Sequence, residues 1–335
     1  MSDGNQVDST GRRRRFRFVA LSISTAVSLL GLWLFLHYRS NQPIYLQEPG
    51  HERTGHRYLY DSTLGWRNIP NWKATTNGNR LTINSKGLRD REYSYAKPAG
   101  VRRILVLGDS FAWGYGVADD EIFTEVIEDR LGREQFVQGV KYEVVNTGVS
   151  GWGTDQEYLF LRQEGFNYSP DIVVLALFIV NDFENNASSI VYGLQKPVFV
   201  NEQLDLANVP VPRPSAPKHV IHTQADRFDL ALSIITHMHD ACTKQQCRLV
   251  VMKFGRYLPR WKDNVDLLSN ERRLRDAAQR LNIAYFDLDD AFDINGVTAD
   301  ELLWGNDDGH WNAYGHRLAA DFLYEFLVES QLITD

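Results

Sequence analysis

Short apolar runs alternate with amphipathic segments along the chain from about residue 102 onward. The runs are rich in aliphatic residues, which is typical of strands buried on both faces; they cover 103–107, 142–145, 171–178, 248–253 and 283–286. Between them, hydrophobic residues recur at the spacing of one helix face, as in 122–131 and 318–327. Five strands separated by helices predict an α/β domain, with a doubly wound parallel sheet covered on both faces.

Polar residues beside these segments indicate where helices begin. Thr154-Asp155-Gln156-Glu157 has the form of a capping box, so a helix is expected to begin at about Thr154. Either Asp119 or Asp120 is expected to cap the helix over 122–131. His316, on the closing helix, is expected to be a surface or capping residue.

Two regions depart from this alternation. Residues 39–100 contain prolines and no long helical period, so they are expected to form a linker and a small β-rich extension before the α/β domain of 101–335. Within that domain, 190–222 is rich in proline, and 197–200 with 204–206 predicts a small hairpin. Because loops of this length are often lids or binding surfaces, 190–222 is a candidate substrate-facing insertion.

The N-terminal segment is expected to be a membrane anchor. Residues 1–17 end in a block of five arginines, and 18–36 contains no charged residue, which is just enough for a helix to cross a bilayer. The arginines favour a cytoplasmic tail over 1–17, a transmembrane helix over 18–38 and an exported, periplasmic or extracytoplasmic remainder. A cleavable signal peptide is the alternative, but residues 37–40 lack a small-x-small cleavage pattern.

Composition limits the possible partners and cofactors. The 335 residues are 43% hydrophobic and 24% charged, as in an ordinary globular protein, and the net charge of −7 argues against a nucleic-acid partner. Cys242 and Cys247 form either a local disulfide or a pair of thiols. Zinc binding with His237 and His239 is disfavoured because these two histidines point to different faces of a helix, and no metal or other cofactor is expected.

A serine follows the first apolar strand. Gly108-Asp109-Ser110 reads as the sharp turn into the next helix, where unpaired amides favour negative charge, so this position suits a nucleophile and an oxyanion. On its own, the tripeptide is equally consistent with an ordinary turn and helix cap.

Three more motifs follow further strand-like runs. They are Asn146-Thr147-Gly148-Val149-Ser150-Gly151, Asn181-Asp182 and Asp307-Asp308-Gly309-His310-Trp311-Asn312. With Ser110, this ordered set resembles the SGNH hydrolases, also called the GDSL esterase and lipase family, across about 210 residues. The resemblance implies a flavodoxin-like three-layer α/β/α sandwich with strand order 2-1-3-4-5.

The resemblance also implies a role for each block. Ser110 would be the nucleophile and His310 the base, with the oxyanion held by the N–H groups of Ser110 and Gly148 and by the side-chain amide of Asn181. Most of the family places the acid that orients the histidine three residues before it, at Asp307 here. The alginate-acetylating relatives place it two before, at Asp308, and the run from Asp308 to Asn312 looks more like theirs.

Tryptophans lie close to these blocks in the sequence. Trp113, Trp152 and Trp311 are tentative substrate contacts, because aromatic faces suit sugar rings; the alternative is that they only pack the crevice walls. The expected protein is therefore a serine esterase acting on O-acyl groups, often acetyl, of a surface or extracellular glycan, or on another ester. Three alternatives stay open: an O-acyltransferase using the same triad, a non-catalytic glycan-binding or assembly subunit, and a metal-dependent hydrolase.

Overall fold

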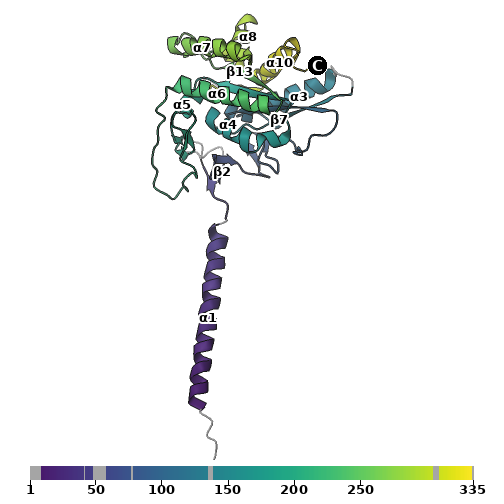
Figure 1. Cartoon of the computed structure of the whole chain (residues 1–335). Coiled ribbons are helices and arrows are strands. Elements are labelled where there is room, and N and C mark those ends of the chain that lie inside the picture. The colour runs from purple at the N-terminus through teal and green to yellow at the C-terminus, as the bar shows by residue number, and fades with distance from the viewer. Residues whose placement is uncertain are drawn as a thin grey trace, which may run out of the picture. The chain divides into compact units, whose positions relative to one another are not determined.

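The computed structural model describes residues 9–40, 42–47, 58–76, 78–134, 139–304 and 309–333. Contacts divide the chain into two units, Met1–Ile44 and Tyr45–Asp335. The first unit contains the long helix α1 (Ser9–Ser40), in which the stretch Arg17–Arg39 has a mean hydropathy of 2.1 and is fully exposed (Figure 1). By length and composition, this helix fits either a membrane anchor or a signal sequence.

The second unit is built on a five-stranded parallel sheet. Its strands are β6 (Val101–Gly108), β7 (Lys141–Asn146), β8 (Ile172–Phe178), β13 (Arg248–Phe254) and β14 (Ala284–Asp287). They are arranged in the order β14-β13-β8-β6-β7. The expected α/β class and strand order are confirmed, and every residue of the central strand β8 is buried, as its continuous apolar sequence predicts.

Alternate residues of each strand face two helical layers. Leu105 and Leu107 of β6 pack in a hydrophobic cluster with side chains of α4 (Thr154–Gln163), α6 (Arg227–Lys244) and α7 (Val265–Leu281). Ile104 and Val106 face the other cluster, with α3 (Phe123–Glu134), α8 (Leu288–Ile294) and α10 (Ala313–Glu329). This is a three-layer sandwich, and Figure 1 shows α4 and α6 side by side within one of its layers.

The β-rich extension joins the core of the second unit. The strands β1 (Tyr45–Leu46), β2 (Tyr58–Asp61) and β3 (Gly65–Asn68) form an antiparallel sheet, and β4 (Lys73–Thr76) pairs with β5 (Asn79–Thr82). Tyr58 and Trp66 are buried in the same cluster as α4 and α6. The extension therefore packs directly on one helical layer of the sandwich.

The proline-rich insertion forms two small antiparallel pairs. β9 (Ile190–Val191) pairs with β10 (Leu194–Gln195), and β11 (Val198–Phe199) pairs with β12 (Leu206–Ala207), which confirms the expected hairpin. Between these pairs the buried Lys196 makes an ion pair with the buried Asp155 of α4. An ion pair between two buried residues fastens the insertion to the sandwich.

Two expectations about helix caps are wrong. α4 begins at Thr154, but its cap is Gly153, and Glu157 is buried with neither carboxylate oxygen bonded to a described residue. Asp119 lies in the short helix η2 (Asp119–Glu121) and pairs with Arg89. Instead, the N–H of Phe123, the first residue of α3, donates to the Nδ1 of the buried His316 at 3.3 Å. A residue almost two hundred positions later in the chain therefore caps this helix.

The two cysteines are buried free thiols. Cys242 lies in the last turn of α6, and the Sγ of Cys247 lies 3.5 Å from the Cys242 carbonyl oxygen. Of the two alternatives that the sequence left open, the structure has the thiol pair.

Candidate active site

Ser110 lies where the first sheet strand turns into a short helix. Asp109 caps this helix, α2 (Ser110–Trp113), and its carboxylate accepts the N–H of Phe111 at 2.9 Å. The turn needs glycine at 108, because a Cβ there would lie 2.7 Å from the Cβ of Ala112. Ser110 is therefore held on a tight strand-to-helix turn, with 8% of its surface exposed.

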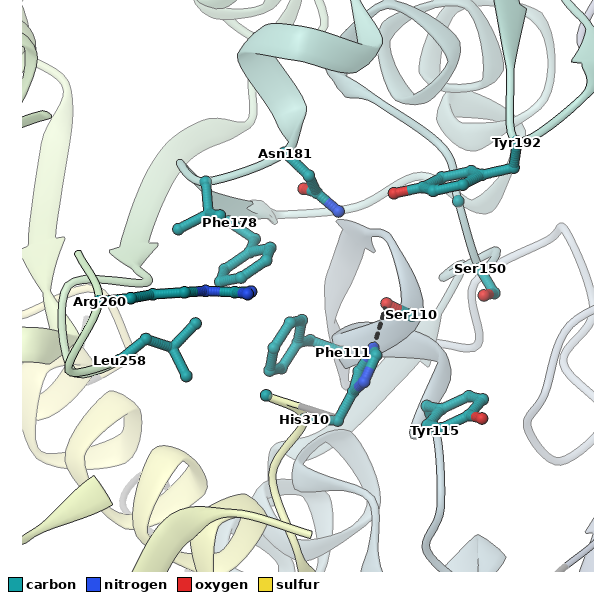
Figure 2. Close-up of a pocket in the computed structure, with 13 residues that line it drawn as sticks. Ser110, Phe111, Tyr115, Ser150, Phe178, Asn181, Tyr192, Leu258, Arg260 and His310 are labelled. Carbon is teal, nitrogen blue, oxygen red and sulfur yellow. Dashed lines mark hydrogen bonds between the residues drawn. The ribbon is translucent and has the colours of Figure 1, made fainter. Parts of the chain in front are cut away.

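His310 reaches Ser110 from the loop before the last helix. Its Nε2 lies 2.8 Å from the Ser110 Oγ, within hydrogen-bond distance (Figure 2). The imidazole packs between the rings of Phe111 and Tyr115, with centroid separations of 4.9 and 4.5 Å. Two hydrogen bonds to backbone carbonyls fix the loop at His310. The His310 carbonyl accepts the N–H of Trp304 at 2.9 Å, and the Gly309 carbonyl accepts the Tyr257 hydroxyl at 2.9 Å.

Asp307 and Asp308 are the two candidates for the acid that orients His310. Asp307 and Asp308 both lie outside the described residues. The choice between them stays a prediction from the sequence.

Asn181 follows β8 and presents its side-chain amide to the same place. Its Nδ2 donates to the Asp109 carboxylate at 3.2 Å, and Figure 2 shows the amide directed toward Ser110. Asp182, the first residue of the short helix α5 (Asp182–Asn185), accepts the N–H of Phe178 at 2.9 Å. The loop is thus braced behind Asn181, and the amide has a second N–H that the bond to Asp109 does not use.

Gly148, whose N–H the family resemblance assigned to the oxyanion, uses that N–H inside its own loop. Its N–H donates to the Asn146 side chain at 2.9 Å, and a Cβ on Gly148 would lie 2.5 Å from the backbone nitrogen of Trp113. Gly148 therefore serves the packing of its loop against α2. Gly151, three residues later, lines the cavity around Ser110 and has a φ of +79°. Within the described part of the chain, the N–H groups of Ser110 and Gly151 have no hydrogen-bond acceptor.

A cavity of about 280 Å³ surrounds the serine and the histidine. One side carries the apolar side chains of Phe111, Phe178, Val180 and Leu258, with Arg260 beside them. The other side carries polar groups: Tyr115, Ser150, Asn181 and Tyr192 (Figure 2). Tyr192 belongs to the turn between β9 and β10, so the 190–222 insertion supplies part of the wall.

The three tryptophans proposed as substrate contacts do not line this cavity. Trp113, Trp152 and Trp311 are at most 2% exposed. The Nε1 of Trp152 donates to the Trp66 carbonyl at 2.9 Å, and Trp311 packs edge-on against Phe111. The substrate-contact expectation was wrong for all three; they pack behind the site, and the aromatic rings that line the cavity are those of Phe111, Tyr115, Phe178 and Tyr192.

A group of buried carboxylates lies behind the serine and the asparagine. Burial raises the pKa of Asp109, and burial together with the neighbouring carboxylates raises the pKa of Glu157 and of Asp182 well above the usual range. Asp155 belongs to the same group but is paired with Lys196. The sequence did not reveal this cluster, because the pattern Thr154-Asp155-Gln156-Glu157 indicated a capping box in which Glu157 bonds to the helix start.

Comparison with known proteins identifies the family. The family model described as "GDSL-like Lipase/Acylhydrolase family" matches residues 106–318, which include Ser110, Asn181 and His310. No curated protein matches the chain significantly.

Solved structures of several esterases are also similar to this chain. The lipase/acylhydrolase from Enterococcus faecalis is 16% identical, with a TM-score of 0.45 over 68% of this chain and 96% of that one. The psychrotrophic esterase EstA from Pseudoalteromonas sp. is 16% identical, with a TM-score of 0.43 over 69% and 99%. The acetyl xylan esterase AlAXEase is 17% identical, with a TM-score of 0.46 over 67% and 98%. Scores this low carry no argument about substrate, whereas the family model spans more than half of the sequence: the chain belongs to the GDSL-like lipase/acylhydrolase family and is a hydrolase of ester bonds.

Proposed function

We propose that this hydrolase cleaves carboxylic esters through an acyl-serine intermediate on Ser110. The observation that carries the proposal is the 2.8 Å separation between the Ser110 Oγ and the His310 Nε2 at the wall of a cavity. His310 removes the hydroxyl proton as Oγ attacks the ester carbonyl, then gives that proton to the leaving alcohol. Water attacks the acyl-serine by the same steps in reverse and releases the acid.

Three donors are available for the oxyanion of the tetrahedral intermediate. We assign them to the N–H of Ser110, the N–H of Gly151 and the Nδ2 of Asn181, with Gly151 in place of Gly148 because the Gly148 N–H is occupied by Asn146. Donors held in place before the reaction stabilise the negative charge without a cost of reorganisation. We assign the orientation of His310 to Asp308 and keep Asp307 as the alternative.

The substrate that fits the site is a short-chain ester of a polyhydroxylated alcohol. At about 280 Å³, the cavity is smaller than most sites that enclose a drug-sized ligand, so it suits a short acyl group such as acetyl. Hydroxyl and amide groups on its polar side suit a glycan alcohol. The arginine block at the N-terminal end of α1, just before its apolar stretch, supports an anchored protein, with residues 1–17 in the cytoplasm and the hydrolase unit outside, where surface glycans are present.

The test is ester hydrolysis by the full chain in detergent micelles. Acetate release from p-nitrophenyl acetate and from an O-acetylated oligosaccharide is expected for the wild type, and the loss on Ser110→Ala should be at least about 10³-fold. The same assay with EDTA should give the same rate, since the proposed steps need only Ser110, His310 and the oxyanion donors. Equal rates for the wild type and Ser110→Ala would overturn the proposal. If acetate appears on an added sugar acceptor instead of in solution, the same acyl-serine serves transfer.

A further inference from the structure

One cation lines the cavity beside the serine and the histidine. Arg260 belongs to the loop between β13 and α7, and Figure 2 shows its guanidinium extending into the cavity beside Phe178 and Leu258. Among the described residues that line the cavity, none is a carboxylate. Among these described lining residues, Arg260 is therefore a positive group with no carboxylate beside it in the wall.

Arg260 differs from the other basic residues of its own loop. Arg256 makes ion pairs with Glu271, Asp290 and Asp293, and Lys262 lies 3.7 Å from Asp293. Within the described ranges, Arg260 makes no ion pair, and its guanidinium lies 5.8 Å from the Trp261 ring. The acidic residues of α7 and α8 thus hold Arg256 and Lys262, while Arg260 is left facing the cavity.

The setting of Arg260 suits a carboxylate. A guanidinium presents two parallel N–H donors that match the two oxygens of a carboxylate, and such charge-assisted pairs are about twice as strong as neutral hydrogen bonds. Phe178 and Leu258 lie beside the guanidinium, and Arg260 is exposed, so an anionic group can reach it from solvent. The net charge of −7 repels anions in general, so a single cation inside the site selects where an anionic group can bind.

We infer that Arg260 binds a carboxylate carried by the ester substrate, so that the preferred substrates are anionic esters. The inference rests on the proposed function, since it assigns one wall of the same cavity. Arg260 and Ser110 line a single cavity of about 280 Å³, so the carboxylate must lie close to the ester bond. It is carried either by the acyl group, as in a hemisuccinate, or by the alcohol, as in an acetylated uronic acid.

Two matched pairs of esters test the inference. The acyl pair is p-nitrophenyl hemisuccinate and p-nitrophenyl butyrate, and the alcohol pair is an O-acetylated methyl galacturonide and the corresponding methyl galactoside. We measure kcat/KM for all four with the full chain in detergent micelles, for the wild type, Arg260→Gln and Arg260→Lys. Lys262→Gln is the control, because it removes a positive charge from the same loop without touching the cavity.

The expected result is a preference for the anionic ester in one of the two pairs, and that pair identifies the position of the carboxylate. The ratio of kcat/KM for the anionic ester to kcat/KM for the neutral ester should fall about tenfold in Arg260→Gln. It should fall less in Arg260→Lys, which keeps the positive charge but loses the two parallel N–H donors of the guanidinium. Lys262→Gln should keep the wild-type ratio. Added salt should lower the ratio in the wild type and leave it nearly constant in Arg260→Gln.

Two results would overturn the inference and are distinguishable from failure of the proposed function. The first is hydrolysis that depends on Ser110 but has the same ratio of kcat/KM, anionic to neutral ester, in the wild type and Arg260→Gln. This result would rule out the carboxylate site and leave the esterase function intact. If Arg260→Gln lowers kcat/KM equally for the anionic and the neutral ester of each pair, the role of Arg260 is to support its loop and not to bind a carboxylate. Hydrolysis of none of the four esters, or equal rates for the wild type and Ser110→Ala, removes the proposed function and this inference with it.

Discussion

His310 and Ser110 are in hydrogen-bond contact, Nε2 to Oγ at 2.8 Å, although 200 positions separate them in the chain. Ser110 is placed by the end of β6 and the cap of α2, and His310 by a loop whose backbone bonds to Trp304 and Tyr257. The two are held by independent parts of the sandwich. The contact is therefore a property of the folded domain and does not require a bound substrate.

Asn181→Ala is expected to lower kcat by about 10²- to 10³-fold, because one of three oxyanion donors is lost. KM should change much less, since the oxyanion exists only in the transition state. The measurement is steady-state hydrolysis of p-nitrophenyl acetate, with Ser150→Ala as the control, since Ser150 lines the cavity on the same polar side. A loss of less than about threefold in Asn181→Ala would remove Asn181 from the oxyanion hole.

Asp308→Asn is expected to lower kcat by up to about 10⁴-fold, because an amide cannot stabilise the imidazolium or hold the correct tautomer of His310. Asp307→Asn should cost far less. Comparison of the two variants in the same assay decides between the acids. A larger loss in Asp307→Asn would transfer the role to Asp307, and small losses in both would contradict the triad.

The fold could be predicted because its signals are local and repeated. Five apolar runs and the helical segments between them specify the class, and the segment 318–327, whose apolar spacing predicts a helix, lies within α10. This prediction depends on regular elements, for which sequence periodicity is a direct consequence of burial. The pairing of Ser110 with His310 could be predicted as well, because the ordered motifs resemble the SGNH hydrolases and the resemblance implies these two roles.

The details that could not be predicted depend on which way a loop residue points. Gly148 and Gly151 stand in one short loop, and only the folded turn decides which N–H faces the cavity. Trp311 adjoins His310 in the sequence, yet it packs behind the site in the core. Arg260 lies in an irregular loop without a motif, so nothing in the sequence connects it to Ser110.

Glu157→Gln is expected to stabilise the protein at alkaline pH. Burial and neighbouring carboxylates raise the pKa of Glu157 in the folded state, so the folded chain binds its proton more tightly than the unfolded chain. Stability is then lost as pH rises above the unfolded pKa, and glutamine, which stays neutral, avoids this loss. Urea unfolding at pH 5 and pH 8 should give a higher midpoint for the variant at pH 8, with a smaller difference at pH 5.

Glu202→Gln is the control for this comparison, because Glu202 is exposed in the insertion. Its midpoints should follow those of the wild type at both pH values. If the midpoints of Glu157→Gln also follow those of the wild type at both pH values, Glu157 is ionised in the folded protein at neutral pH. That result would contradict the raised pKa of Glu157.

His316→Asn is expected to remove part of the acid sensitivity of folding. Burial and the neighbouring Arg89 lower the pKa of His316 to about 3, whereas the unfolded chain takes up the proton near 6.5. Stability is therefore lost as pH falls below 6.5, by about 2 kcal/mol at pH 5. Asparagine offers an acceptor to the Phe123 N–H and does not titrate, so the variant should lose about 2 kcal/mol less between pH 7 and pH 5.

The exposed His237 supplies the control, since His237→Asn should keep the wild-type pH dependence. Unfolding of the full chain in detergent micelles, followed by tryptophan fluorescence, gives both comparisons. Identical pH dependence in His316→Asn and the wild type would mean that His316 is protonated inside the fold.

The acyl-serine itself gives the most direct test of the mechanism. The full chain is mixed with p-nitrophenyl acetate, quenched in acid within the first turnover, digested and analysed by mass spectrometry. We predict one added acetyl group on the peptide that contains Ser110, absent from Ser110→Ala and formed far more slowly in His310→Asn. Rapid acetate release with no acetylated Ser110, or the same acetylation rate in His310→Asn as in the wild type, would contradict the account.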